Sequence, residues 1–517
     1  MIYVFILVIV LNISIAFAIK FNKRVEETLF LSIFGIILLL FLSGVISNFE
    51  WGYYLILILS VYFLFFNIKS IYKNKKILKE NILTPGLLLL ILSSIFLVWL
   101  NYGRVFVVWD EFSHWALVVK NMLYFNNFGL GSDSTVLAKS YLSGTSLFQY
   151  FCIKLNVSYN ESILYFGQNL IFLSLILPMF KKVKKLSNII LWLSYAMIVL
   201  LPTLFYPYFY SSLYVDAILG IAFAYSIYSY YLNYDDGLNK FNFINLSASL
   251  AMLIFIKDFG IILSLITFFI VLIDNVVIKN KFSLKNLWNN GKFIILAYLP
   301  AVLIKIIWII KLKFSVPVSA SGGSSMVNHI INLFKEGLVG YKSTVFHSFI
   351  NALFFKELSS SSVIKISFVV VICMFVLLVY LLIHKMQKNS LKTSYIFSSV
   401  SIILGAIGYA ALILIAYLTI FSDYESLRLA SFERYIGTYI LGVFVTIFAL
   451  LIGKYVSDKK NESIFVILSL ATLLCLTNYN VILNSTIYAR ADVNTTKNIR
   501  EPYKKFKEIT DKYIKKD

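Results

Sequence analysis

Two adjacent carboxylates, Asp110 and Glu111, are the residues of this sequence best placed for acid–base chemistry. They directly follow a long apolar segment, in the run Trp109-Asp110-Glu111-Phe112. An ionised carboxylate beside a lipid-like environment is costly unless water, a cation or a substrate compensates its charge. The pair therefore predicts a functional site at a membrane boundary. The alternative is that Asp110 only caps a helix and that Glu111 is solvated.

A helix is predicted from 111 to 126, because apolar residues recur there at helical spacing. We expect it to lie at the membrane interface with its apolar face in lipid. His114 follows one turn after both carboxylates, so it can share a face with them. It is a candidate substrate-binding residue or, equally, a structural histidine. Farther along, Tyr141-Leu142-Ser143-Gly144 predicts a turn that leads into a second interfacial helix.

The composition requires a membrane protein. Of 517 residues, 60% are hydrophobic and 14% are charged, and apolar stretches of helix-spanning length recur along the chain. The predicted class is an all-α, polytopic transmembrane protein. Its net charge of +21 falls in short clusters between the apolar stretches. This pattern sets membrane topology and contacts anionic lipid, and it argues against a nucleic-acid partner.

We predict about fourteen spans, at 2–19, 28–47, 52–69, 84–101, 161–180, 188–206, 212–232, 243–256, 259–277, 293–312, 363–383, 395–420, 434–453 and 463–484. Residues 1–83 then form N-terminal transmembrane helices and 84–484 form the catalytic unit. That unit has outer loops at about 102–160 and 313–362. Residues 485–517 form a short outer tail.

Orientation follows from the basic clusters between the spans. With fourteen spans and the N-terminus outside, all six clusters fall on one face, from Lys20-Lys23-Arg24 to the lysines between 454 and 460. The positive-inside rule makes that face cytoplasmic. We therefore expect a plasma-membrane protein whose carboxylate pair faces the extracytoplasmic side.

Cations on the predicted outer side are candidate partners for an anionic substrate. Lys257 and Asp258 lie in a turn between two apolar segments, either as a binding site or as a simple hairpin ion pair. Arg428 and Arg434 lie at the mouth of the thirteenth span, against the usual distribution of arginine. Arg434 either meets a phosphate or pairs with a nearby acid such as Glu433. Asp216, at the outer end of the seventh span, is a functional candidate or a helix N-terminal acid.

The acidic pair and the turn at Tyr141-Leu142-Ser143-Gly144, within a large outer loop, resemble the GT-C class of integral-membrane glycosyltransferases. That class includes protein mannosyltransferases and the aminoarabinose transferases of lipid A. The similarity covers the general plan from about 84 onward. The sequence departs from it in having Leu142-Ser143 where prolines are common, and in three extra spans before the acidic pair.

The resemblance implies transfer of a sugar from a polyprenyl-phosphate carrier to a cell-surface glycan, lipid or polymer. Asp110 would be the general base, and Glu111 would orient it, bind the acceptor or help Asp110 hold a divalent cation such as Mg²⁺ or Mn²⁺. A leaving phosphate needs cations, which would be Lys257, Arg434 and Arg428. The remaining candidate substrate-binding residues are His114, Tyr141, Asp216, Asp258 and Tyr435.

Two other functions remain as alternatives. A polysaccharide polymerase or ligase also uses a lipid-linked donor and outer arginines, with its catalytic cluster in a late outer loop. A lipid-linked-oligosaccharide flippase or other transporter would show mid-membrane charges and symmetry between halves, and the sequence shows neither.

Overall fold

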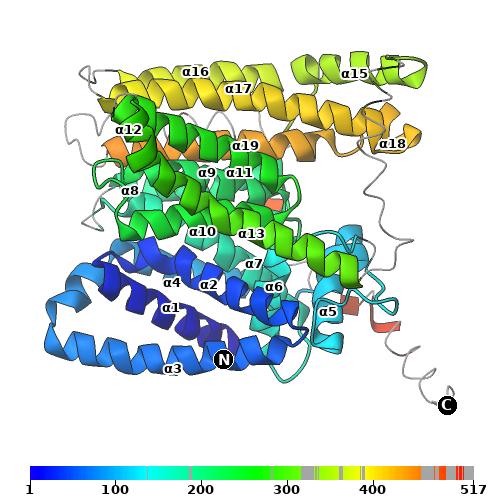
Figure 1. Ribbon diagram of the computed structural model, residues 1–517. Coiled ribbons are helices and arrows are strands. Elements are labelled where there is room, and N and C mark those ends of the chain that lie inside the picture. Colours follow the sequence, from blue (N-terminus) through cyan, green and yellow to red (C-terminus); the bar gives the residue numbers. More distant parts are fainter. Residues whose placement is uncertain are drawn as a thin grey trace.

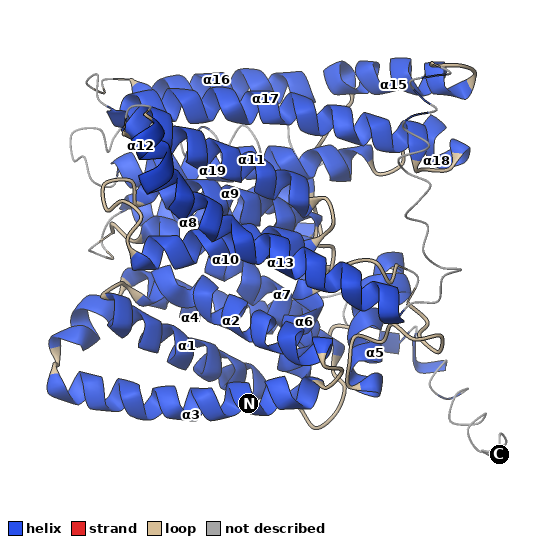
Figure 2. Cartoon of the chain, viewed as in Figure 1, coloured by secondary structure: helices blue, strands red, loops and turns tan. Residues whose placement is uncertain are grey.

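The computed structural model describes most of the chain. Its described ranges, apart from a few isolated residues, are 1–136, 138–183, 189–280, 283–315, 337–359, 365–384, 390–455, 477–484 and 500–502. Within these ranges all regular structure is helical (Figure 2). Eight of the described helices are long and apolar enough to cross a bilayer. The protein is therefore an all-α polytopic membrane protein.

The helices follow the predicted spans closely. Their bounds are α1 (Ile2–Phe21), α2 (Val25–Val45), α3 (Phe49–Lys73), α4 (Pro85–Asn101), α5 (Ala116–Phe125), α6 (Gly144–Lys154), α7 (Glu161–Ile176), α8 (Ile189–Phe205), α9 (Asp216–Leu232), α10 (Lys240–Ile256), α11 (Gly260–Ile273), α13 (Lys292–Ser315), α15 (Tyr341–Phe355), α16 (Phe368–Ile383), α17 (Ser390–Thr419), α18 (Asp423–Leu427) and α19 (Phe432–Tyr455). Every predicted span up to 434–453 overlaps one of them. The predicted span 463–484 and the tail 485–517 lie largely outside the described residues.

The helices stack in layers. Figure 1 shows α1 and α3 along one edge and α16 and α17 along the opposite edge, with α9, α10 and α19 between them. The N-terminal helices belong to this stack, because α2 packs against α6, α7 and α10. Buried amides join them to one another, since Asn67 Nδ2 donates to Asn12 Oδ1 at 2.8 Å. Residues 1–83 are thus part of one helical assembly.

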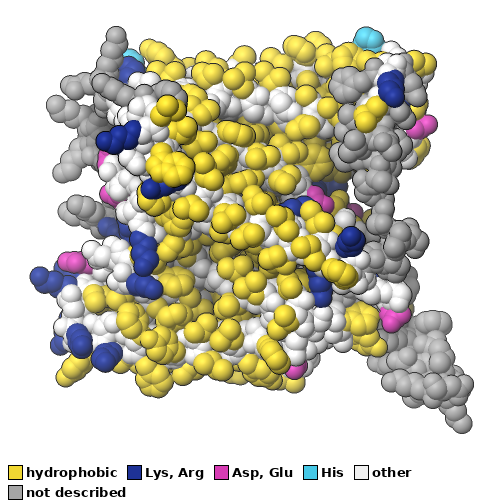
Figure 3. Space-filling model, viewed as in Figure 1, with side chains coloured by type: hydrophobic (Ala, Val, Ile, Leu, Met, Phe, Trp, Pro, Cys, Tyr) yellow, Lys and Arg dark blue, Asp and Glu magenta, His cyan; other side chains and the backbone are white. Residues whose placement is uncertain are grey.

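The turns predicted to be cytoplasmic lie together at one end. Lys23 pairs with Asp236 at 3.2 Å and Lys181 with Glu27 at 3.5 Å, which joins turns far apart in the sequence. Figure 3 shows lysines and arginines gathered along this edge, beside a broad hydrophobic face. We call it the lysine-rich end, defined by the turns and helix ends that contain Lys23, Lys181, Lys279 and Lys454.

A close contact between α9 and α19 brings the predicted outer ends of two spans together. An ideal Cβ on Gly220 would lie 2.2 Å from the Thr438 carbonyl oxygen, and one on Gly442 would lie 2.8 Å from the Gly220 oxygen. Small residues allow such close backbone approach between transmembrane helices. One turn before Gly220 stands Asp216, and one turn before Thr438 stands Arg434. The glycine contact therefore places these two charges side by side.

The predicted interfacial helices are buried in the protein. Residues 111–115 form one π-helical turn that continues into α5, whose Val118, Val119 and Met122 are buried. Helix α6 is buried from Gly144 to Ile153. The expectation that their apolar faces lie in lipid is wrong, because α5 and α6 pack against each other and α6 packs against α2 and α7.

Candidate functional site

The two adjacent carboxylates turn to different partners. Asp110 stands at the N-cap position of the π-helical turn but makes no capping hydrogen bond with its side chain. Its Oδ2 instead lies 2.9 Å from Nη1 of Arg434, which reaches it from the start of α19. The Asp110 side chain retains 31% exposure. Asp110 is therefore an accessible carboxylate held by a cation rather than a helix cap.

Glu111 points inward and is saturated with hydrogen bonds. Its Oε2 accepts from the Val107 and Val108 amides at 3.0 and 3.1 Å, and its Oε1 accepts from the Tyr165 hydroxyl at 2.9 Å and the Leu213 amide at 3.1 Å. Burial raises the pKa of Glu111, and these hydrogen bonds oppose that rise. Glu111 thus fastens the loop that carries Asp110 to α7 and to the segment before α9.

Asp216 joins two cations behind Asp110. Its Oδ1 lies 2.7 Å from Lys257 Nζ, and its Oδ2 lies 3.7 Å from Arg434 Nε. The Asp216 side chain is only 3% exposed. Charges this buried require their partners, because an unpaired ion in a low-dielectric environment is strongly unfavourable. Asp110, Arg434, Asp216 and Lys257 form an alternating series that we call the acid–base chain.

Aromatic rings cover the two cations of the acid–base chain. The Tyr435 ring centre lies 5.2 Å from Lys257 Nζ and 5.3 Å from the Arg434 guanidinium carbon. The Tyr214 ring lies 4.8 Å from the same guanidinium. The faces of aromatic rings attract cations electrostatically. The rings hold the cations in place without neutralising them.

His114 and Tyr141 pack against each other next to Asp110. The two rings meet edge to face with their centres 5.3 Å apart. Both His114 nitrogens are buried without a hydrogen-bond partner among the described residues. Burial lowers the pKa of His114 to about 4, against a smaller opposing influence of Asp110. The imidazole is therefore neutral at physiological pH and offers one donor and one acceptor.

Asp258 pairs with a cation that the sequence reasoning missed. Lys305, on α13, places Nζ 2.7 Å from Asp258 Oδ1. A lysine inside an apolar span is a functional candidate by its position alone, and this signal could have found it. Arg428 lies apart from the acid–base chain, because its guanidinium is exposed and rests 4.9 Å from the Tyr424 ring. The structure therefore brings together all the sequence-predicted site residues except Arg428.

A second carboxylate secures the same loop. Glu161, at the start of α7, accepts the Phe106 amide at 2.5 Å. It also receives Arg500 in a bidentate contact at 2.7 and 3.0 Å. Together, Glu111 and Glu161 bind three successive backbone amides, at residues 106 to 108. The sequence offered no spacing that would reveal this contact with the tail.

The residues do not fit the predicted joint binding of a divalent cation by Asp110 and Glu111. A carboxylate has about four acceptor positions, and Glu111 uses four for the hydrogen bonds above. Across the described parts of the chain, no group of three His, Cys, Asp or Glu side chains is spaced for a metal. We therefore derive no step through a metal ion.

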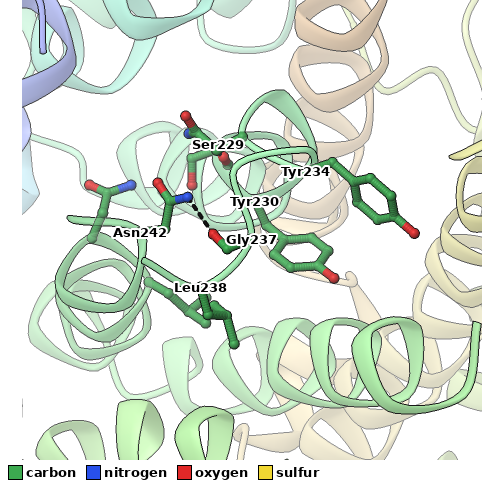
Figure 4. Close-up of a pocket in the computed structure, with 9 residues that line it drawn as sticks. Ser229, Tyr230, Tyr234, Gly237, Leu238 and Asn242 are labelled. Atoms are coloured by element: carbon green, nitrogen blue, oxygen red, sulfur yellow. Dashed lines mark hydrogen bonds between the residues drawn. The ribbon is translucent and has the colours of Figure 1, made fainter. Parts of the chain in front are cut away.

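A small hollow lies near the lysine-rich end. Figure 4 shows its lining, including Ser229, Tyr234 and Asn242, with the Asn242 amide bonded to the Gly237 carbonyl at 2.6 Å. No carboxylate, lysine, arginine or histidine lines it. It lacks the acid–base groups found around Asp110, so we place the candidate site at the acid–base chain.

The fold and the site define a polytopic helical membrane protein with a paired acid–base chain at the end opposite its lysine-rich turns. Comparison with protein families, curated proteins and solved structures finds no match.

Proposed function

We propose that this protein is a membrane glycosyltransferase that transfers a sugar from a polyprenyl-phosphate carrier to a cell-surface acceptor. The observation that most supports this proposal is the Asp110–Arg434 pair at 2.9 Å, with Lys257 behind it. It offers a base for an acceptor and cations for a phosphate in one site. The resemblance of Asp110-Glu111 and the following loop to GT-C enzymes points the same way. Because the lysine-rich end is cytoplasmic by the positive-inside rule, transfer takes place on the extracytoplasmic face.

The proposed reaction is a single displacement at the anomeric carbon. The acceptor hydroxyl attacks this carbon while Asp110 takes its proton. The bond from the anomeric carbon to the phosphate oxygen breaks, and its electron pair leaves with the carrier phosphate. Arg434 and Lys257 stabilise the charge that grows on that phosphate. Asp216 keeps both cations in position from behind.

Donor binding also prepares the base. Arg434 Nη1 donates to Asp110 Oδ2 at 2.9 Å. A phosphate that binds Arg434 competes for the same N–H groups, because a guanidinium binds phosphate and carboxylate in similar ways. Asp110 is then released toward the acceptor. Neutral His114 and the Tyr141 ring are placed to contact the sugar or the acceptor beside it.

The test compares surface glycans and lipid-linked sugars in cells that carry wild type or Asp110→Asn. We expect the variant to fold, a glycosyl modification to disappear and its lipid-linked donor to accumulate. Asp236→Asn, which alters an exposed carboxylate at the lysine-rich end, is the matched control and should leave both unchanged. An unaltered glycan profile in Asp110→Asn cells would contradict the proposal. Lipid transport in proteoliposomes without covalent transfer would favour a flippase instead.

A further inference from the structure

One ion pair lies on the hydrophobic face of the molecule. The side chains of Lys305 and Asp258 are 24% and 34% exposed. On α13, one turn to either side of Lys305, Val302 and Ile309 are exposed at 37% and 54% while Ala301 and Trp308 are buried, so Lys305 stands at the edge of the exposed face. Figure 3 shows acidic and basic side chains set within the hydrophobic face, away from the lysine-rich edge. The pair therefore meets the surface that contacts lipid.

This position is unusual for a structural ion pair. Charged side chains within membrane spans are costly, and they normally face the protein interior or a water-filled cavity. Lys305 stands ten residues before the end of α13, which is ~15 Å along the helix. It contacts Asp258 in the turn between α10 and α11. The protein thus keeps a partly exposed cation and anion together at the edge of its hydrophobic face.

The pair continues into the acid–base chain. Asp258 follows Lys257 directly, so the charges run from Lys305 and Asp258 through Lys257 and Asp216 to Arg434 and Asp110. Side-chain exposure is 10% and 3% at Lys257 and Asp216, and it rises again to 24% and 31% at Arg434 and Asp110. The series is therefore buried in the middle and open at both ends.

Tyr141 lies at the junction of the two parts. Burial raises the pKa of its phenol, and the charges of Lys257 and Asp258 act on that pKa in opposite directions. The ring also contacts His114, beside Asp110. A ligand that reached from the Asp258 end to the Asp110 end would pass this residue.

We propose that the Lys305–Asp258 pair is a lateral access site for the phosphate headgroup of a lipid that enters from the bilayer. The phosphate displaces Asp258 from Lys305, and then passes to Lys257 and Arg434, while its hydrocarbon chain stays beside α13. The acceptor reaches Asp110 from the opposite, aqueous side. This inference rests on the proposed function, since it identifies how the lipid-linked donor enters that site.

The test measures binding of undecaprenyl phosphate to the full-length protein in nanodiscs, without any transfer reaction. We expect Lys305→Met to weaken binding by about tenfold or more, because a charge-assisted contact is lost. Lys305→Arg should retain most of it. Lys311→Met is the matched control on the same helix, because Lys311 contacts the Val45 carbonyl and the Ser47 hydroxyl instead. Melting temperatures check that each variant is folded.

Competitors separate the possible sources of the phosphate. Excess phosphatidylglycerol or inorganic phosphate should fail to displace undecaprenyl phosphate. Displacement by inorganic phosphate at matched concentration would overturn a lateral lipid route, and displacement by phosphatidylglycerol would overturn a site for the carrier. Equal binding by wild type and folded Lys305→Met would overturn the role of Lys305.

The two proposals can fail separately. If Lys305→Met binds normally while Asp110→Asn abolishes sugar transfer in cells, only the access site is wrong. If Lys305→Met loses binding while Asp110→Asn leaves every glycan intact, the lipid site stands and glycosyl transfer is wrong.

Discussion

The two ends of this protein use the same basic residues in different ways. At the lysine-rich end, Lys181 pairs with Glu27, whose side chain is 9% exposed, and other cations close helix C-termini: Lys454 donates to the Leu382 carbonyl at 2.6 Å, and Lys279 donates to the Tyr234 carbonyl. Such contacts satisfy free carbonyls and the negative end of the helix dipole. At the other end, Lys257 and Arg434 meet buried or half-buried carboxylates. The comparison teaches that a buried ion pair occurs at both ends, and that the end near Asp110 differs because one buried acid, Asp216, joins two cations and so links them to a more exposed carboxylate.

The largest effect is expected where the two helices that carry the acid–base chain touch. In Gly220→Leu the new Cβ would lie 2.2 Å from the Thr438 carbonyl oxygen, so α9 and α19 must separate. Backbone atoms cannot yield as a side chain does, so we expect a loss of more than about 3 kcal/mol and of sugar transfer. Melting temperature and yield of folded protein measure the loss of stability. Gly408→Leu, in open space on α17, should change neither.

Breaking one ion pair at each end tests the comparison directly. Lys257→Met leaves Asp216 buried without its closest cation, which should destabilise the protein by about 3–5 kcal/mol. Lys23→Met removes a pair whose acid, Asp236, is 50% exposed, and should cost at most about 1 kcal/mol. Thermal unfolding of both variants in one detergent compares the two losses of stability. Similar losses at the two ends would remove the distinction between them.

A smaller effect is expected at Glu111. In Glu111→Gln an amide NH₂ faces donors, so at least one of the four hydrogen bonds is lost, at about 1–3 kcal/mol. Because the loop that carries Asp110 then loosens, the rate of transfer should fall while binding of undecaprenyl phosphate persists. Glu425→Gln, which alters an exposed capping residue of α18, is the control. Loss of lipid binding in folded Glu111→Gln would contradict a purely positioning role.

Acid should weaken the site through His114. Its folded-state pKa of about 4 lies below the ordinary value of 6.5, so the unfolded chain binds more protons between these values. The contribution of His114 to the free energy of unfolding is complete above pH 6.5 and falls as the pH drops toward 4. It amounts to about 3 kcal/mol. His114→Leu should show a shallower decline of melting temperature over this range. If the melting temperatures of wild type and His114→Leu declined in parallel with pH, His114 would not be the cause of the decline.

The smallest effect is expected at Arg428. Its exposed contact with Tyr424 contributes little, so Arg428→Ala should change stability by less than about 0.5 kcal/mol and leave transfer intact. Arg434→Ala should abolish transfer. If Arg428→Ala were equally damaging in a transfer assay, a late-loop catalytic cluster, as in a polymerase or ligase, would become the better explanation.

Hydropathy predicted the long apolar helices, because spans are long and lipid imposes one rule on all of them, but it missed α15, which lies in the predicted outer loop at 313–362. It also placed Asp110, Asp216, Lys257 and Arg434 at the same side of the membrane. It could not show that Asp110 and Glu111 turn apart, because this depends on the Leu213 amide, about a hundred positions away. The sequence did not reveal that α5 and α6 are buried, because an apolar helical face has the same sequence pattern whether it contacts lipid or protein.

The contact between Glu161 and Arg500 spans 339 positions of the chain. Glu161 is made early, yet it meets its arginine only after residue 500 has been synthesised and delivered to the same side of the bilayer. Until then Glu161, which accepts the Phe106 amide, lacks its arginine partner. A partly made chain therefore carries the acid–base chain beside a carboxylate whose ion pair is still missing, and this support is completed late in biogenesis.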